Sequence, residues 1–176
     1  YYKTINILKE NYEIISRPEQ IQNAKSALIA ELIDWEKSQI ETEINRHYAG
    51  FYLGLTPQTQ AIFSNLSKIN KTFAINSKVE TDLTRDATKV CFLIEDHPGI
   101  FSRLAGAIAL SGANVIDART YTTSDGFATS VFWIQNKEGK PFEENRLNKL
   151  NQTISDALKG QIIARDVLKE KGKIKK

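Results

Sequence analysis

The spacing of hydrophobic residues divides the chain into a helical part and a mixed part. Up to about residue 70, apolar residues recur every three or four positions, a spacing that predicts amphipathic helices. The first apolar stripe consists of Tyr1, Ile5, Leu8, Tyr12 and Ile15. The second stripe follows Pro18 and consists of Ile21, Ala24, Leu28, Leu32 and Trp35. We therefore expect two amphipathic helices at the beginning of the chain.

Two further helix starts are predicted from capping residues. Ser38 and Glu41 have the spacing of a capping box, and Ile40, Ile44 and Tyr48 follow at helical spacing. Thr56 and Pro57 combine an N-cap with a first-turn proline, ahead of an apolar stripe made of Ile62, Phe63, Leu66 and Ile69. The first seventy residues are therefore expected to form short, packed helices.

The period changes from about 3.6 to 2 near Phe73, which predicts strands. Residues 73–81 alternate as one strand, and residues 82–86 supply a turn. Residues 90–94 are continuously apolar, as in a strand covered on both faces or central in a sheet. Residues 99–111 then return to helical spacing, and Gly112 is placed to take the left-handed cap.

The remaining pattern predicts a hairpin and another helix. Residues 115–123 and 127–135 read as strands joined by the turn residues 124–126, and an amphipathic helix follows that ends at Gly160. The order strand, helix, strand, strand, helix matches an α+β, ferredoxin-like βαββα(β) domain. Ile162 and Ile163 are placed to begin a final strand, but charged, lysine-rich residues follow. We therefore expect that last strand to be missing or incomplete.

Composition narrows the classes of protein. The 176 residues are 41% hydrophobic and 26% charged, which excludes disorder throughout, and no apolar run is long enough to span a membrane. The net charge is +3 and the last twelve residues carry +4, so nucleic-acid binding would depend on that tail alone. A single cysteine, Cys91, excludes an internal disulfide and fits a reduced, cytoplasmic protein. The start at Tyr1 and the absence of methionine suggest a piece of a longer polypeptide.

The segment 95–101 is the most informative for ligand binding, because a strand ends there and a helix begins. Pro98 is expected to pre-set the first helical turn, while Gly99 lets a ligand approach the backbone closely. The unpaired amides and partial positive charge of a helix start suit the carboxylate of a small acid or amino acid. The alternative is a tight turn that binds nothing.

Residues for catalysis or metal binding are not found in the chain. The only histidines, His47 and His97, lie far apart in sequence, so a metal centre is not expected, and His47 is predicted at the surface or at a helix end. No Gly-x-Ser-x-Gly elbow is present. We therefore predict no catalytic and no metal-binding residue.

Asp117 and Arg119 alternate along the strand predicted at residues 115–123. They form either a solvated face of the sheet or a contact with a neighbouring module that transmits ligand occupancy. Phe127, Val131 and Trp133 make an apolar stripe on the next strand, typical of core or interface packing.

Three motifs together resemble an ACT domain, a small-molecule sensing module attached to many metabolic enzymes. They are Asp96-x-Pro98-Gly99-x-Phe101, Gly112-x-Asn114-Val115-Ile116, and the hairpin with Asp125-Gly126. The resemblance extends beyond this module, from His47-Tyr48 through Pro57 and on to Asn114-Val115-Ile116-Asp117-Ala118-Arg119. Over residues 1 to about 170 the chain resembles the bifunctional PII-protein uridylyltransferases/uridylyl-removing enzymes.

The resemblance implies a division of the chain into three parts. Residues 1–72 would be the end of an HD-type phosphohydrolase domain with its helical connection, residues 73–164 the first ACT domain, and residues 165–176 a basic linker to a second ACT domain. The transferase site of that family needs a Gly-Ser pair and closely spaced aspartates, which this chain lacks. A regulatory segment without an active site of its own is therefore implied, with magnesium expected only for the full-length enzyme and no cofactor in this segment.

The resemblance also implies a ligand and a partner. The segment would bind glutamine or a similar small amino acid at the seam between paired ACT domains, and the full-length enzyme would act on the PII signalling protein in nitrogen regulation. The implied ligand-binding residues are Asp96, His97, Pro98, Gly99 and Ile100, with Asn114, Val115 and Ile116 opposite. Members of the family commonly have Arg in place of His97, which weakens the expectation of a fixed positive charge there.

A second function remains open from the residues alone. An ACT-like fold can serve only for dimerisation or for docking another protein, and a missing last strand would leave a sheet edge open to pairing. Under this interpretation the chain is an interaction module that senses nothing.

Overall fold

The computed structural model describes residues 16–69 and 75–174, with side chains up to Gln161. Contacts divide the chain into two compact units, Tyr1–Ser64 and Asn65–Lys176, and each is described by itself. The predicted stripe from Tyr1 to Ile15, the predicted strand start at Phe73 and the predicted boundary after residue 72 lie outside the described residues.

Helices make up the described part of the first unit: α2 (Arg17–Glu31), α3 (Lys37–Arg46), α4 (Ala49–Gly54) and α5 (Pro57–Lys68), whose last turn belongs to the second unit. The Oγ of Ser16 accepts the N–H of Glu19 at 3.3 Å and caps α2. Oγ1 of Thr56 accepts the N–H of Thr59, also at 3.3 Å. These caps and first-turn prolines confirm the predicted starts of α2 and α5.

The predicted start and end of α3 are wrong. The N-cap is Glu36, whose N–H donates to Oε1 of Gln39 at 3.3 Å, so the capping pair lies two residues before Ser38 and Glu41. His47 has extended backbone angles and ends the helix, so Tyr48 precedes a new short helix instead of continuing the stripe. Three-residue cap spacings overlap here, and the sequence alone did not decide between them.

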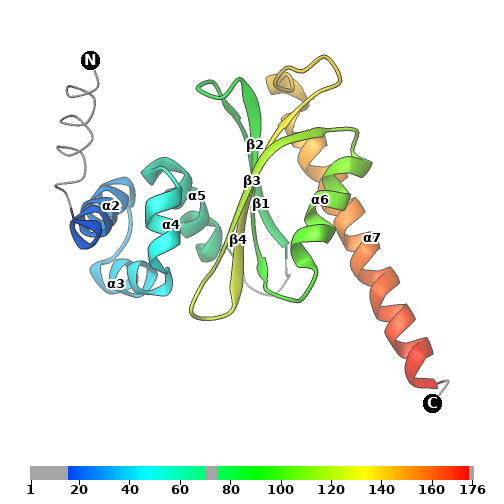
Figure 1. Cartoon of the computed structure of the whole chain (residues 1–176), viewed down its shortest axis with the longest axis horizontal. Coiled ribbons are helices and arrows are strands. Elements are labelled where there is room, and N and C mark those ends of the chain that lie inside the picture. The colour runs from blue at the N-terminus through cyan, green and yellow to red at the C-terminus, as the bar shows by residue number, and fades with distance from the viewer. Residues whose placement is uncertain (1–15, 70–74, 175–176) are drawn as a thin grey trace, which may run out of the picture. The chain divides into compact units, whose positions relative to one another are not determined.

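The second unit is a four-stranded antiparallel sheet with helices on one face. Its strands are β1 (Ile75–Asp82), β2 (Ala87–Glu95), β3 (Asn114–Thr122) and β4 (Phe127–Gln135), in the order β1-β2-β4-β3. Helices α6 (Ile100–Leu110) and α7 (Leu147–Ile174), the latter preceded by the 3₁₀ turn η1 (Glu144–Arg146), cover the same face (Figure 1). This is the predicted α+β, ferredoxin-like arrangement.

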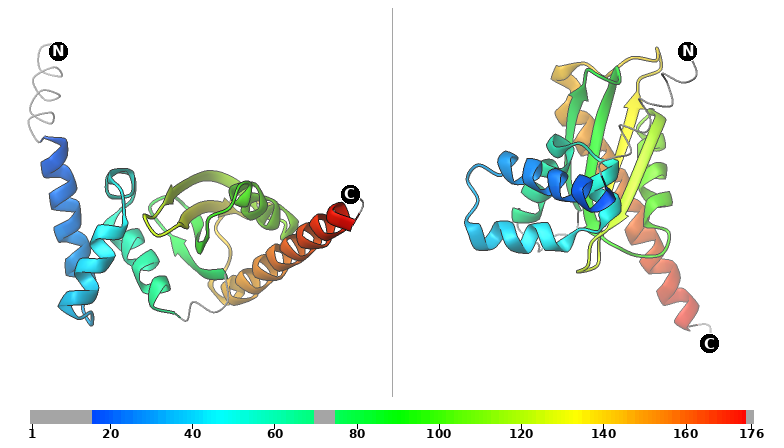
Figure 2. Two further views of the ribbon diagram at one scale, coloured as in Figure 1. Left: turned by 90° about the horizontal axis from the view of Figure 1, so that it is seen from below. Right: turned by 60° about the vertical axis from the view of Figure 1, so that its left-hand side comes forward.

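The position of a last strand is filled by β1, which comes before the domain's other elements in the chain instead of after them. β1 pairs with β2 along its whole length, from Ile75 opposite Ile94 to Asp82 opposite Ala87. The prediction that Ile162 and Ile163 could start a strand is wrong, because α7 continues through them to Ile174 (Figure 2).

Gly160 does not end α7, contrary to the prediction. It has no left-handed backbone, and no atom lies within 4 Å of the position its Cβ would take. A single glycine inside a helix costs only about 1 kcal/mol relative to alanine, so the helix passes through it. Gly112, in contrast, takes the predicted left-handed cap with φ 83°.

The core of the second unit lies between the sheet and its two helices. Every residue of β2 from Ala87 to Ile94 is buried, which confirms the prediction of a central strand, and the strand is paired on both sides. Side chains from three directions meet there: Phe92 and Phe132 from the sheet, Leu104 and Ile108 from α6, and Ile154 and Leu158 from α7. Within the described residues, no helix combines the length and hydrophobicity needed to cross a membrane.

Candidate functional site

The predicted ligand loop is a turn held at both sides. The N–H of Asp96 donates to the carbonyl of Gly126 at 2.9 Å, and the N–H of Ile100 donates to the carbonyl of His97 at 3.1 Å. Gly99 has φ 84° and ψ 2°, the values of the third residue of a type II turn, with Pro98 as the second. Pro98 therefore precedes α6, which begins at Ile100, and does not shape its first turn as predicted.

The loop presents polar groups to solvent beside a helix start. Asp96, Pro98 and Gly99 are exposed, the His97 side chain is 40% exposed, and Ile100 is buried in the core. Oγ1 of Thr122 donates to Oδ2 of Asp96 at 3.4 Å, which ties the loop to the end of β3. Within the described residues no side chain caps α6, so the amides of Phe101 and Ser102 in its first turn keep the donor capacity that favours an acidic group.

The other predicted ligand-binding residues, Asn114, Val115 and Ile116, lie at the end of the sheet opposite the Asp96 loop. Asn114 pairs with Gln135 at one end of the β3–β4 ladder, and Thr122 pairs with Ala128 at the other. The nine-residue strand spans about 26 Å at roughly 3.3 Å per residue, so Asn114 is that far from the Asp96 end. A single chain therefore does not bring the two groups of predicted ligand residues together.

A β-bulge shapes the start of β3. Val115 pairs with Ile134, and the next pair is Asp117 with Trp133, so Ile116 is the extra residue. Val115 is 43% exposed and Ile116 is 47% exposed. The bulge therefore interrupts the alternation of this strand just before Asp117, and two apolar side chains are exposed on the edge strand of the sheet.

Asp117 is held in a charged cluster that sequence reasoning missed. Its Oδ2 accepts a hydrogen bond from Nη1 of Arg85 at 2.7 Å and lies 3.8 Å from Nη2 of Arg119. This hydrogen bond from Arg85 holds the pKa of Asp117 below its ordinary value. Arg85 lies in the turn predicted at residues 82–86 and is 32 positions before Asp117 in the chain, so no short motif pointed to this pair.

The cluster is built around the Trp133 ring. The guanidinium of Arg85 lies 3.9 Å from the ring centroid, and Nε1 of Trp133 donates to Oδ2 of Asp82 at 2.9 Å. Arg85 and Trp133 thus engage Asp117 and Arg119 within the unit, and both of these side chains remain 39% exposed on the sheet.

His47 lies at a helix end, as the C-cap of α3, which is one of its two predicted places, but it is buried and not at the surface. It is 8% exposed, its Nε2 lies 2.9 Å from Oε1 of Glu43, and its ring stacks on Phe51 with centroids 3.8 Å apart. Nη1 of Arg46 donates to the other Glu43 oxygen, Oε2, at 2.8 Å. Burial alone would raise the pKa of Glu43, but the hydrogen bond to His47 and the charge of Arg46 together keep this pKa below its ordinary value.

Gln60 adds buried hydrogen bonds to the same helical unit. Its Nε2 lies within hydrogen-bond distance of the carbonyls of Phe51, Tyr52 and Leu55, and its side chain is fully buried. These buried contacts join α3, α4 and α5, so His47 has a structural place within the first unit.

Metal binding and thiol chemistry find no support in the described part of the chain. No three His, Cys, Asp or Glu side chains gather there in a way that could hold a metal ion. Cys91 is buried on β2, and burial raises the pKa of its thiol to about 12. Such a thiol stays protonated and unreactive at neutral pH.

Comparison with curated proteins gives relatives along the whole chain. The bifunctional uridylyltransferase/uridylyl-removing enzyme of Cereibacter sphaeroides is 45% identical over 176 residues, which are 100% of this chain and 19% of that enzyme. The enzyme of the same name from Ruegeria pomeroyi is 45% identical over 99% of the chain, and that from Rhodospirillum rubrum is 30% identical over 92%.

The chain is a homologue of one segment of bifunctional uridylyltransferases/uridylyl-removing enzymes. It spans about a fifth of the length of these relatives. No protein-family model matches the chain. The resemblance of the second unit to an ACT domain therefore rests on its motifs and on its ferredoxin-like sheet.

Proposed function

We propose that this chain is the glutamine-sensing, regulatory segment of a bifunctional PII-protein uridylyltransferase/uridylyl-removing enzyme. The names of the relatives support the enzyme, and the loop from Asp96 to Ile100 beside an uncapped helix start supports the binding of an amino acid's carboxylate. The PII signalling protein is the proposed partner of the whole enzyme, and magnesium is proposed for its transferase site.

The observation that carries this proposal is the exposed edge strand β3. It ends the sheet on one side, and Val115 and Ile116 are large apolar residues exposed on it. An exposed apolar edge favours pairing with another strand. On the opposite edge strand, β1, the large apolar residues Ile75 and Val79 are partly buried against the core, so that edge offers less exposed apolar surface.

Antiparallel pairing of β3 with the same strand of a second ACT domain would complete the ligand site. In a register centred on Ala118, Asn114 of one domain lies opposite Thr122 of the other. Thr122 contacts Asp96, so this pairing would bring Asn114, Val115 and Ile116 of one domain beside the Asp96 loop of the other. The two groups, separated in a single chain, would then line one seam.

Thermal unfolding with millimolar glutamine tests sensing. A ligand that binds only the folded state stabilises it by about 2.7 kcal/mol at a hundred times its dissociation constant, so the melting temperature should rise. Asp96→Asn should abolish that rise, whereas Asp34→Asn, at an exposed aspartate of the first unit, should leave it unchanged. An unchanged melting temperature with glutamine would contradict the proposal.

Sedimentation equilibrium tests the pairing. Ile116→Glu places a charge on the β3 edge and should shift the protein toward the monomer and remove the glutamine response together. Ile33→Glu is the matched control, because Ile33 is 86% exposed and belongs to the first unit, outside the sheet. A glutamine response in an Ile116→Glu monomer would refute the shared seam.

The exposed edge also favours a second candidate function, a dimerisation or protein-interaction module that senses nothing. This function predicts melting that depends on protein concentration, that is lost in Ile116→Glu, and that is unaffected by any amino acid. The same two measurements therefore separate the candidates.

A further inference from the structure

A polar groove lies at the end of the second unit where β3 begins. It runs between the end of α6, the loop that follows β4, and the start of α7, and consists of two adjoining hollows of about 540 and 380 Å³ that share Ser111, Phe142 and Arg146. A single hollow of this size is within the range of small-molecule sites. We call it the Phe142 groove.

Hydrogen bonds fix the loop that forms one wall of the groove. Oδ1 of Asn136 accepts the N–H groups of Glu138 and Lys140, each at 3.0 Å, and the N–H of Asn136 donates to the carbonyl of Lys140 at 2.8 Å. The N–H of Phe142 donates to Oγ1 of the buried Thr88 at 2.9 Å. The loop is thus pre-organised, and a ligand would not have to order it on binding.

Basic side chains surround the groove. Lys137 lies on one wall, and Arg146 and Lys149 come from η1 and α7 on the other. In the described part of the chain, no carboxylate lies within ion-pair distance of Lys137 or Lys149, and Nε of Arg146 is 3.7 Å from Glu143 in a pair whose side chains are over 70% exposed. Such an exposed pair contributes little, so these cations keep most of their capacity for an anion.

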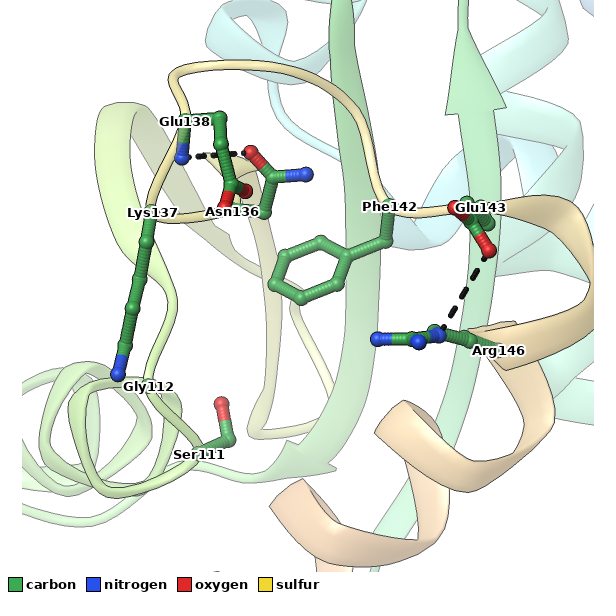
Figure 3. A pocket seen from close by; sticks show the side chains of 8 residues that line it. All are labelled: Ser111, Gly112, Asn136, Lys137, Glu138, Phe142, Glu143 and Arg146. Carbon is green, nitrogen blue, oxygen red and sulfur yellow. Dashed lines mark hydrogen bonds and ion pairs between the residues drawn. The ribbon is translucent and has the colours of Figure 1, made fainter.

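Figure 3 shows the polar side chains of Ser111 and Arg146 directed toward the space beside the Phe142 ring. Phe142 is half-buried and packs against the core with part of its surface, which leaves the rest to the groove. An aromatic face next to cations and neutral hydrogen-bonding groups suits an organic phosphate with a planar ring. Glu138 and Glu143 supply acceptors for hydroxyl groups.

We propose that the Phe142 groove binds a nucleoside monophosphate, with its phosphate at Arg146 and Lys149 and its base against Phe142. The groove is at the opposite end of the sheet from Asp96 of the same chain and near the start of β3, and this proposal does not rest on the proposed glutamine seam. Recognition is by charge and by the flat face of the base, so both purine and pyrimidine nucleotides should bind.

Isothermal titration of the protein with AMP, UMP, adenosine and inorganic phosphate tests the site. AMP and UMP should bind, and each should bind at least about tenfold more tightly than adenosine or phosphate alone, because only the nucleotides use both the cations and the ring. The absence of heat with both nucleotides at about 5 mM would overturn the proposal.

Variants locate the binding. Replacing Arg146 and Lys149 together by alanine removes two charge-assisted contacts and should weaken AMP binding by about tenfold or more. Lys159→Ala, at an exposed lysine ten residues further along α7, is the matched control and should change nothing. Equal affinities in the double variant and the wild type would refute the groove as the site.

Phe142→Leu tests the contribution of the base to binding separately from the contribution of the phosphate. It should weaken AMP binding several-fold and leave the weak binding of inorganic phosphate unchanged. A melting curve with a cooperative transition checks that the variant is folded. Unchanged AMP binding in the folded variant would contradict the assignment of the base to Phe142.

Discussion

The first unit keeps ionisable side chains in its interior, whereas the cluster between the sheet and the helices of the second unit is made of apolar side chains. Glu43, His47 and Tyr52 are all buried in the first unit, and Arg46 reaches the Glu43 carboxylate. In the second unit, the buried cluster contains apolar side chains such as Phe92, Phe132 and Leu104. The polar groups proposed for ligand binding in the second unit lie at the two ends of its sheet.

This difference separates two sources of stability. Burial of apolar surface stabilises the second unit without regard to pH, and leaves the loops at its ends free to serve ligands. The first unit depends on a charged network whose members lose their partners if one is removed or neutralised. Substitutions of Phe132 and Glu43 test this contrast, and amide hydrogen exchange measures the stability of each unit separately.

The largest effect is expected for Phe132→Ala. Phe132 is fully buried, and its truncation should lower the free energy of unfolding of the second unit by about 3 to 5 kcal/mol. Phe101, whose ring stacks on it with centroids 5.3 Å apart, is 39% exposed and provides the control. Phe101→Ala should cost about 1 kcal/mol, and equal losses would show that the core is not the main source of stability.

Glu43→Gln tests the charged network of the first unit. The pKa of Glu43 is lower in the folded state than its ordinary value of 4.5, so the ionised carboxylate stabilises the fold above that pH, and this contribution is lost as the pH falls through the folded-state pKa. At about pH 7 the variant should lose roughly 2 kcal/mol, and the difference from the wild type should shrink below pH 4.5.

The control for this substitution is Glu41→Gln, on the same helix and exposed. It should leave stability nearly unchanged at either pH. A loss in Glu43→Gln that is the same at low and neutral pH would mean that shape, and not charge, gives Glu43 its effect.

The smallest effects are expected for two glycines of the second unit, and they should have opposite signs. Gly99 has φ 84° with no atom near a new Cβ, so Gly99→Ala should destabilise by about 1 kcal/mol through backbone strain alone. Gly160 is helical and equally uncrowded, so Gly160→Ala should stabilise by up to about 1 kcal/mol. Denaturant unfolding measures both, and destabilisation by Gly160→Ala would mean that α7 is distorted there.

The parts of the fold that are decided by residues close together in the sequence were predictable from sequence. The apolar run from Val90 to Ile94 gave the central strand, residues 124–126 gave the hairpin turn, and Gly112 gave the helix end, because each is decided within a few positions. The position of β1 in the sheet was not predictable in this way, since any antiparallel strand could complete that edge.

The sites show the same division. The turn at Asp96 was predictable because Pro98 and Gly99 are typical turn residues. Its distance from Asn114 depends on the direction of β3 in the sheet, which residue types do not reveal. Glu43 and His47 are four positions apart next to the apolar Ile44, a spacing that could have indicated a buried pair. The Phe142 groove joins the end of α6, a loop and the start of α7, and has no short motif.

The placement of β1 at the edge next to β2 has a mechanical consequence. β1 is the first strand after the helices, and it runs antiparallel to the strand to which a hairpin joins it. Tension applied at residue 75 would therefore load the ladder at its open end, breaking its hydrogen bonds in succession instead of all at once. The chain that leaves α5 thus enters the sheet at the open end of the β1–β2 ladder, where a pull would separate one residue pair at a time.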